Sequence, residues 1–267
     1  MTCTCIATMS GMDELFISGI RIDWNLATDG VCENSGHPRG RDDTVPSTHP
    51  DFYVSSIPAL RSLNELEFDN PITMFTGENG TGKSTLLEAI AQAYGFNPEG
   101  GTRNYRFSTY DDVSNLSNRI TLIRRRGYSR SGYFFRAESF FNVATQARAY
   151  DRSGELFHLH EQSHGESFLA FMRAFDGPGL YIMDEPEAAL SPQRQLSLLV
   201  MLHRMVAEGS QFIIATHSPI LLGFPGASLL TLDDGRIHPC ALEDTASYSI
   251  MATFINHRDS LFHHLFG

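Results

Sequence analysis

The chain has 267 residues, 42% of them hydrophobic, so it can bury the core of one large α/β domain. Its sequence shows neither an apolar run of roughly 18 residues, as a membrane span needs, nor a signal-peptide pattern, so we expect a cytoplasmic protein. The net charge of −11 disfavours a protein that coats nucleic acid or binds anionic lipid over its whole surface.

The first part of the chain predicts little regular structure. Residues 13–24 include the alternation of an opening strand, whereas residues 25–50 are rich in Gly, Pro, Asp, Ser and Thr and predict a loop. Residues 52–68 predict one or two further strands, broken at Pro58. We therefore treat residues 1–50 as partly irregular.

A strand, a glycine-rich loop and a helix follow in that order. The apolar run 72–76 predicts a short strand, and it leads directly into the loop 77–84. Residues 84–94 carry apolar side chains at helical spacing, and Gly95 is placed to end that helix.

The remaining chain alternates strands and helices. Residues 119–125 and 133–137 predict strands on either side of a turn at 127–132, and residues 166–175 predict a helix. Two short apolar runs, 180–183 and 211–215, predict buried strands.

A longer helix separates these two buried strands. Ser191 precedes a proline and predicts its N-cap, and Gly209 predicts its end. Residues 229–232 and 236–240 predict a closing hairpin, and residues 241–267 a final helix that docks on the domain.

These elements predict an α/β fold with a mostly parallel sheet flanked by helices and an additional antiparallel β subdomain. We expect a single domain over residues 1–267, whose recognisable part is 52–240.

The loop matches the pattern G-x-x-x-x-G-K-[ST] without a mismatch. Glycines let backbone N–H groups surround an anion, and the following helix directs the positive end of its dipole there. Lys83 is predicted to contact the β- and γ-phosphates of a nucleotide, and Ser84 to ligate Mg²⁺. Lys83 is also the only lysine of a chain that has nineteen arginines. This favours a role for Lys83 that needs a compact ammonium group. The predicted nucleotide-binding residues of this loop are Gly77, Glu78, Asn79, Gly80, Thr81, Gly82, Lys83, Ser84 and Thr85.

Acidic residues and a histidine follow the two buried strands. Asp184 is the candidate Mg²⁺ ligand, and Glu185 is placed to orient or deprotonate an attacking water. His217 follows the next strand and can hydrogen-bond a γ-phosphate. Alone, the acidic pair could equally cap a strand, and a single histidine would more often be structural.

The tetrapeptide Ser163-His164-Gly165-Glu166 precedes the predicted helix at 166–175. Its hydroxyl and backbone N–H groups could bind an anion, but Ser163 and Glu166 also form a helix capping box. By itself this segment is weak evidence for a site.

Four segments in this order resemble the motifs of the ATP-binding cassette superfamily. They are the loop 77–84, the segment 163–166, Leu-Tyr-Ile-Met-Asp-Glu-Pro at 180–186 and Ala-Thr-His-Ser-Pro at 215–219. The resemblance is strongest to stand-alone AAA-type ATPases of the SMC and DNA-repair branch. It implies a short helical signature subdomain, ATP and Mg²⁺ as cofactors, ATP hydrolysis, and head-to-tail homodimerisation with ATP. In that dimer Ser163 and Gly165 would contact the γ-phosphate held by the partner's Lys83.

The sequence also departs from this family. Ser191 stands where members often carry an aspartate, and the magnesium-contacting glutamine is not evident, with Glu138 and Gln146 as candidates. Phe52 and Tyr53 are candidates for the residue that stacks on adenine. The insertion before Ser163 is too short for coiled-coil arms.

The partner of such an ATPase is left open by the sequence. The run Arg124-Arg125-Arg126, with Arg119, Arg130, Arg136, Tyr128 and Tyr133 nearby, could contact nucleic acid, although a solvated hairpin or an acidic protein partner is favoured. The leading interpretation is a nucleotide-driven dimerisation switch that acts on a protein or nucleic acid. The alternatives are the ATP-hydrolysing subunit of a membrane transporter and a regulatory module that binds ATP without hydrolysing it.

Overall fold

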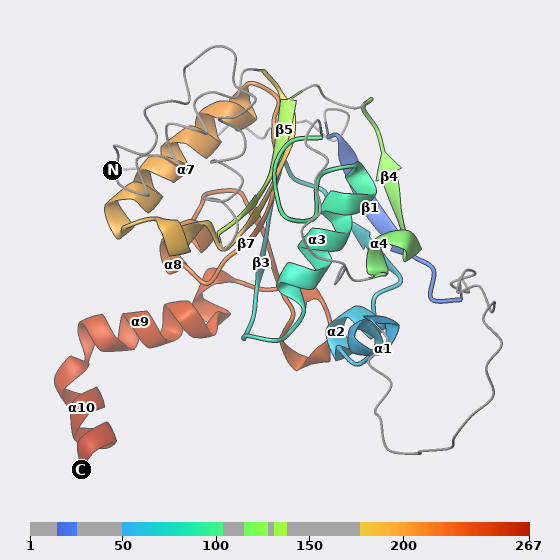
Figure 1. Ribbon diagram of the computed structural model, residues 1–267. Helices are drawn as coiled ribbons and strands as arrows, with labels where there is room; N and C mark the ends of the chain where they lie inside the picture. Colours follow the sequence, from blue (N-terminus) through green and yellow to red (C-terminus); the bar gives the residue numbers. More distant parts are fainter. Residues whose placement is uncertain (1–14, 26–49, 104–114, 128–130, 138–176) are drawn as a thin grey trace, which may run out of the picture.

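The computed structural model describes residues 15–25, 50–103, 115–127, 131–137 and 177–267. In these residues a sheet with helices on both faces forms the body of the molecule, and two further helices extend away from it (Figure 1).

The main sheet has six strands in the order β5-β6-β7-β3-β8-β9. The first five strands are parallel to their neighbours, and β9 pairs antiparallel with β8. These strands are β3 (Ile72–Thr76), β5 (Ser131–Arg136), β6 (Gly179–Asp184), β7 (Gln211–Ala215), β8 (Ser228–Thr231) and β9 (His238–Pro239). The predicted mostly parallel α/β sheet is confirmed.

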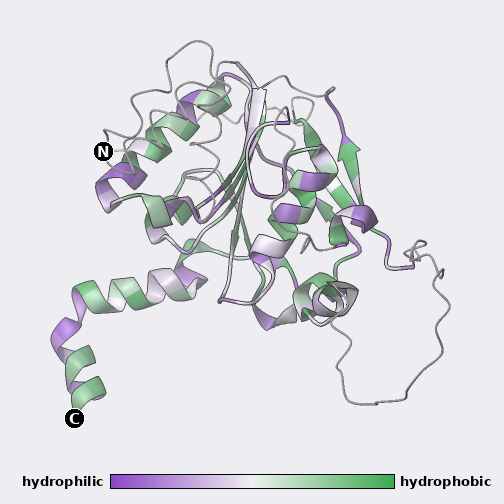
Figure 2. Cartoon of the chain, in the orientation of Figure 1, coloured by the Kyte–Doolittle hydropathy of each residue, from purple (hydrophilic) through white to green (hydrophobic). Residues whose placement is uncertain are grey.

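Helices cover both faces of this sheet, as the sequence predicts for a parallel sheet. The helix α3 (Lys83–Tyr94) lies on one face, and α7 (Pro192–Ala207) with α8 (Pro219–Leu222) lies on the other (Figure 1). Every residue of β3, β6 and β7 is buried, which agrees with their largely apolar sequences. Figure 2 shows these strands as hydrophobic and the outer helix faces as mixed.

The ends of α3 and α7 follow the predicted signals. Gly95 follows α3 with φ of 104°, a left-handed conformation that glycine adopts without strain, and its N–H bonds the carbonyls of Ala91 and Gln92. Ser191 is the N-cap of α7 and Pro192 its first residue, but the Ser191 hydroxyl makes no capping hydrogen bond. The position of this N-cap is therefore as predicted, whereas the side-chain cap is not formed.

A smaller antiparallel sheet packs beside the main one. It has the order β2-β1-β4, formed by β1 (Ile17–Ile22), β2 (Glu65–Glu67) and β4 (Ile120–Arg124). The buried side chain of Gln211 in β7 joins the two sheets. Its Oε1 accepts from the backbone N–H groups of Phe16 (2.9 Å) and Ile17 (3.0 Å), and its Nε2 donates to the Ile17 carbonyl (2.8 Å).

The prediction of one or two strands broken at Pro58 in the segment 52–68 is only partly confirmed. Its first part is helical, with α1 (Pro50–Ser55) and α2 (Pro58–Arg61), and only the short strand β2 follows. Pro58 begins α2 and does not break a strand, because its ring fixes a helical φ and its missing N–H is not needed in a first turn.

The strands on either side of the turn at 127–132 are present but do not form a hairpin. The strand β4 pairs with β1 in the small sheet, whereas β5 pairs in parallel with β6 in the main sheet. The short helix α4 (Leu116–Arg119) precedes β4. The four central residues of β5 are buried, which suits a strand of the helix-covered parallel sheet better than a solvated hairpin.

The last part of the chain differs from the single docked helix that the sequence predicts. After the short 3₁₀ segments η3 (Pro186–Ala189), η4 (Asp233–Gly235) and η5 (Leu242–Asp244), two α-helices, α9 (Ala246–Asn256) and α10 (Arg258–Phe266), end the chain. Neither helix has a buried residue. Within the described residues no helix has the length and apolar character to cross a membrane.

Candidate functional site

The loop between β3 and α3 has the backbone shape of an anion cradle. Gly77, Gly80 and Gly82 all have positive φ, at 134°, 82° and 102°. At Gly82 a Cβ atom would lie 2.9 Å from a side-chain carbon of Ile57 in the turn before α2, so only glycine fits. The strand, the loop and the helix therefore occur in the order that the motif requires.

Lys83 is buried at the base of this loop, with 4% of its surface exposed. Its Nζ donates to the carbonyls of Gly77 and Glu78, both at 2.7 Å. Burial lowers the pKa of Lys83 below its ordinary value of 10.5, and the carboxylates of Glu185, Asp233, Asp184 and Glu187 oppose that shift. One ammonium group thus lies among four acidic residues.

Ser84 and Asp184 are brought together from distant parts of the sequence. Asp184 ends β6 and is buried, and the Ser84 hydroxyl at the start of α3 donates to Asp184 Oδ1 at 3.0 Å. These are hard oxygen donors, which Mg²⁺ prefers. Among the described residues, no group of three or more His, Cys, Asp or Glu side chains could hold a metal by itself. Mg²⁺ usually takes one or two protein ligands and completes its shell with phosphate and water.

Glu185 and His217 lie beside one another at the ends of adjacent strands. Glu185 has a left-handed backbone (φ 49°, ψ 53°), rare for a non-glycine residue, and its N–H donates to the Ala215 carbonyl at 2.9 Å. Its side chain is partly exposed, and its Oε1 lies 3.7 Å from His217 Nε2. This nitrogen is buried and makes no hydrogen bond to any described residue.

Glu187 is a site residue that the sequence analysis missed. Its Oε1 accepts from the backbone N–H of His217 at 2.6 Å, while its Oε2 is buried with no hydrogen-bond partner in the described part of the chain. Glu187 lies in the 3₁₀ turn after Glu185, two positions further on. That spacing could have signalled a second carboxylate on the same side of the turn, but the pattern is too common to be specific.

Asp233 is a second missed residue, located after β8. Its Oδ1 accepts from the N–H of Glu78 at 2.9 Å, and its Oδ2 accepts from the Thr231 hydroxyl at 3.0 Å. It therefore anchors the first turn of the phosphate loop to the neighbouring strand. In the sequence, Asp233 lies in the turn between the two strands of the predicted closing hairpin, and nothing there marks it as a site residue.

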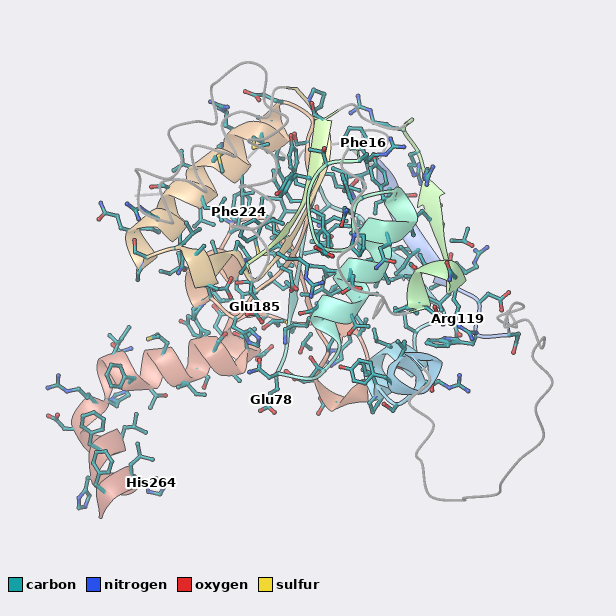
Figure 3. All side chains as sticks on the ribbon, viewed as in Figure 1. Phe16, Glu78, Arg119, Glu185, Phe224 and His264 are labelled. Carbon is teal, nitrogen blue, oxygen red and sulfur yellow. The ribbon has the colours of Figure 1, made fainter. Side chains whose placement is uncertain are left out.

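The structure thus gathers most of the predicted site at one edge of the sheet, where Glu78 and Glu185 are labelled in Figure 3. Asn79, Gly80, Thr81 and Thr85 lie in or directly after the loop, and the Thr81 hydroxyl donates to the Glu78 carbonyl at 2.8 Å. Lys83, Ser84, Asp184, Glu185 and His217 are contributed by three elements that lie side by side, α3, β6 and β7.

Other predicted residues lie outside the described part of the chain. These are Ser163, Gly165 and Glu166 of the signature segment, the helix at 166–175, and the glutamine candidates Glu138 and Gln146. The side chain of Phe52 is also not described, whereas Tyr53 is exposed on α1.

Several arginines of the predicted basic patch make contacts within the described part of the protein, whereas Tyr128 and Arg130 lie outside it. Arg136 is paired with the half-buried Glu88 of α3 at 2.9 Å, and Arg119 donates to the Trp24 carbonyl at 3.1 Å. Arg124 and Arg126 lie over the rings of Tyr94 and Phe16. These side chains support the packing of the small sheet on the body of the domain, which weakens the case for a nucleic-acid surface there.

A parallel sheet with a glycine loop after β3, a buried loop lysine and an acidic residue at the end of another parallel strand, β6, defines a P-loop nucleotide-binding domain. Two family models match this chain: an AAA domain over residues 56–163, and over residues 167–223 an AAA domain described as a putative AbiEii toxin of a type IV toxin–antitoxin system. The fold and both matches agree that this part of the chain is similar to AAA-type P-loop ATPase domains. This class of protein binds and hydrolyses nucleotides.

Solved structures with a similar arrangement are distant. A metal-chelate type ABC transporter in an inward-facing conformation has 18% identity and a TM-score of 0.38, covering 68% of this chain and 76% of its own. The SMC head domain from Thermotoga maritima has 16% identity and a TM-score of 0.39, covering 66% of this chain and 93% of its own. Scores of this size add no argument about function. No curated protein sequence matches the chain.

Proposed function

We propose that this chain binds Mg-ATP at the loop 77–84 and hydrolyses it, and that ATP drives a reversible head-to-tail pairing of two copies. The observation that carries the proposal is the position of Lys83. Lys83 is buried under a loop of left-handed glycines, and the adjacent Ser84 is hydrogen-bonded to Asp184 at the end of β6.

The charges around Lys83 support magnesium as part of the ligand. Four carboxylates lie near the single ammonium group, so the site repels a free triphosphate. A divalent cation bound with the nucleotide reverses this balance, because it places positive charge between the phosphates and the carboxylates. Ser84 and Asp184 are the residues that would hold it.

Glu185 is the residue that we assign to water activation. Its carboxylate is partly exposed at the rim of the site, where a water molecule can reach it, and it lies near the ring nitrogen of His217. His217 in turn would donate a hydrogen bond to the γ-phosphate, and Lys83 would stabilise charge on the same group.

The switch function is the least direct part of the proposal. Ser163 and Gly165 would complete the site of the other copy, so that ATP joins the two copies and loss of phosphate releases them. A protein or a nucleic acid would respond to that change. The support for this step is the order of the motifs in the sequence and the family class.

The Glu185→Gln variant tests the proposal. It removes the water-activating carboxylate but keeps the size of the side chain, so we expect phosphate release to fall by about 10²–10⁴-fold while ATP affinity is retained. The trapped ATP should hold a dimer on a sizing column.

Lys83→Ala is the matched control, because it should lose both ATP binding and the thermal stabilisation by ATP. A Glu185→Gln protein that hydrolyses ATP at the wild-type rate would refute the assigned role. One that stays monomeric with saturating Mg-ATP would refute the switch.

A further inference from the structure

The helices α9 and α10 form an arm that leaves the body of the domain (Figure 1). It is attached through the turn η5 and through contacts of α9 with α8, the short helix that begins two residues after His217. The hydroxyl of the buried Thr245 caps α9 by accepting from the N–H of Tyr248. The two helices of the arm thus start from a fixed point but pack little on their own domain.

The arm is held in one shape by its own aromatic residues. The chain bends at His257, between the helices. Across this bend the rings of Phe254 and Phe262 meet edge-on at 6.1 Å, and Phe262 lies 5.4 Å from Phe266. A groove lined by residues 254–260 runs along the bend. The arm is therefore a folded unit with a defined surface.

This surface is unusually apolar for one that faces water, and Figure 2 shows much of both helices as hydrophobic. On α9, Ile250, Met251, Phe254 and Ile255 form a stripe roughly 140° wide at about 100° per residue, as wide as the core-facing side of a packed helix. The exposed large apolar side chains of the arm are Ile250, Met251, Phe254, Ile255, Phe262, Leu265 and Phe266.

The area of this surface is that of an interface. At roughly 100 Å² of exposed surface for each of these side chains, the arm presents about 700 Å², more than the largest apolar patch of a typical monomer. If two copies bury it mutually, the total is about 1,400 Å², within the range of a stable protein–protein interface.

The charge of the arm indicates which kind of partner can bind its apolar surface. Between Ala246 and Gly267 the only Asp, Glu, Lys or Arg residues are Arg258 and Asp259, which pair with each other at 3.6 Å. The arm is thus neutral, whereas the chain as a whole carries −11. A nucleic acid or an anionic membrane would require several Lys or Arg side chains, whereas the only one in the arm, Arg258, is paired with Asp259. A second copy of this chain can approach an uncharged patch without the repulsion that the rest of its surface imposes.

We propose that the α9–α10 arm is a dimerisation element, which packs against the same arm of a second copy through a two-fold symmetric apolar interface. Such pairing needs no nucleotide, because neither Lys83 nor the phosphate loop takes part. It would keep two ATP sites near one another and so favour ATP-driven pairing of the domains. Only this last consequence rests on the proposed function.

The test compares the wild-type chain with a triple variant, Ile250→Gln, Ile255→Gln and Phe266→Gln, by sedimentation equilibrium without nucleotide over roughly 1–100 μM. These side chains are 67%, 69% and 80% exposed, so glutamine should leave the fold intact, with the urea midpoint as a check. We expect a wild-type dimer and a variant whose dissociation constant is raised by roughly 100-fold or more.

Two controls separate this proposal from the ATP-driven switch. Val200→Gln alters an equally exposed residue of α7 and should dimerise as the wild type does, and so should Lys83→Ala, which tests the nucleotide site. A wild-type chain that is monomeric throughout, or a triple variant with unchanged dimerisation, overturns the proposal. Arm-dependent binding of the wild type to phosphatidylcholine vesicles overturns it as well, since the arm would then be a membrane contact.

Discussion

Removal of the Glu187 carboxylate should weaken catalysis through His217 without removing any group that contacts ATP. Glu187 Oε1 holds the backbone N–H of His217 at 2.6 Å, and the ring nitrogen of that histidine lies 3.7 Å from Glu185. A hydrogen bond to a charged acceptor contributes about 1.5–3 kcal/mol. If that energy serves to place His217 in the transition state, Glu187→Ala lowers kcat by roughly 10- to 150-fold.

The assay is steady-state phosphate release at varied ATP, with Glu187→Gln as the matched control. Glutamine retains an oxygen acceptor for the His217 N–H, so its kcat should lie between those of the wild type and the alanine variant. Because Glu187 is a positioning residue, KM for ATP should change far less than kcat. Alanine and wild-type chains with kcat values within twofold of each other would refute the reasoning. A parallel fall in ATP affinity would place Glu187 in nucleotide binding.

Two further predictions follow from buried polar groups. Labelling with ¹³C-lysine reports on Lys83 alone, because it is the only lysine. The pKa of Lys83 measured by NMR should lie below 10.5, because burial disfavours the charged form. A value at or above 10.5 contradicts the buried site. Since the folded chain then binds this proton less tightly than the unfolded chain, the contribution of Lys83 to stability should rise with pH between the lowered pKa and 10.5. Gln211→Leu leaves three buried backbone groups of Phe16 and Ile17 unbonded, so urea unfolding should show a loss of roughly 3–6 kcal/mol, whereas the exposed Gln193→Leu should change stability by less than about 0.5 kcal/mol.

The parallel core of the fold is predictable from sequence because its central strands β3, β6 and β7 are buried on both faces. Continuous apolar runs such as 72–76 and 211–215 have no other stable place in a protein of this size. The errors occur where apolar residues are few and the local pattern is short. In segment 52–68 the tertiary contact of Ile57 and Leu60 with Gly82 decides for helix, and that contact joins residues far apart in the chain.

The predicted site residues are likewise marked by local sequence patterns, whereas the missed ones depend on contacts between distant parts of the chain. Lys83, Ser84 and Asp184 belong to motifs in which the spacing itself encodes the geometry, so their proximity could be expected. Glu187 and Asp233 act through hydrogen bonds to the backbone of residues that lie 30 and 155 positions away. A carboxylate can serve in this way from many positions, and no local pattern marks the one that does.

The choice of lysine at position 83, in a chain that otherwise uses arginine, follows from the room beneath the loop. Two carbonyls of consecutive residues, Gly77 and Glu78, converge on one nitrogen at 2.7 Å each. An ammonium group satisfies both from a single point and keeps a third donor, whereas the planar guanidinium of arginine spreads its donors over several ångströms. An arginine side chain would have to displace the loop, whose shape depends on the left-handed glycines. The loop conformation therefore requires both the glycines and a lysine at position 83. The four carboxylates near Lys83 favour, for the same reason of charge, the proposed Mg²⁺ that would accompany the nucleotide.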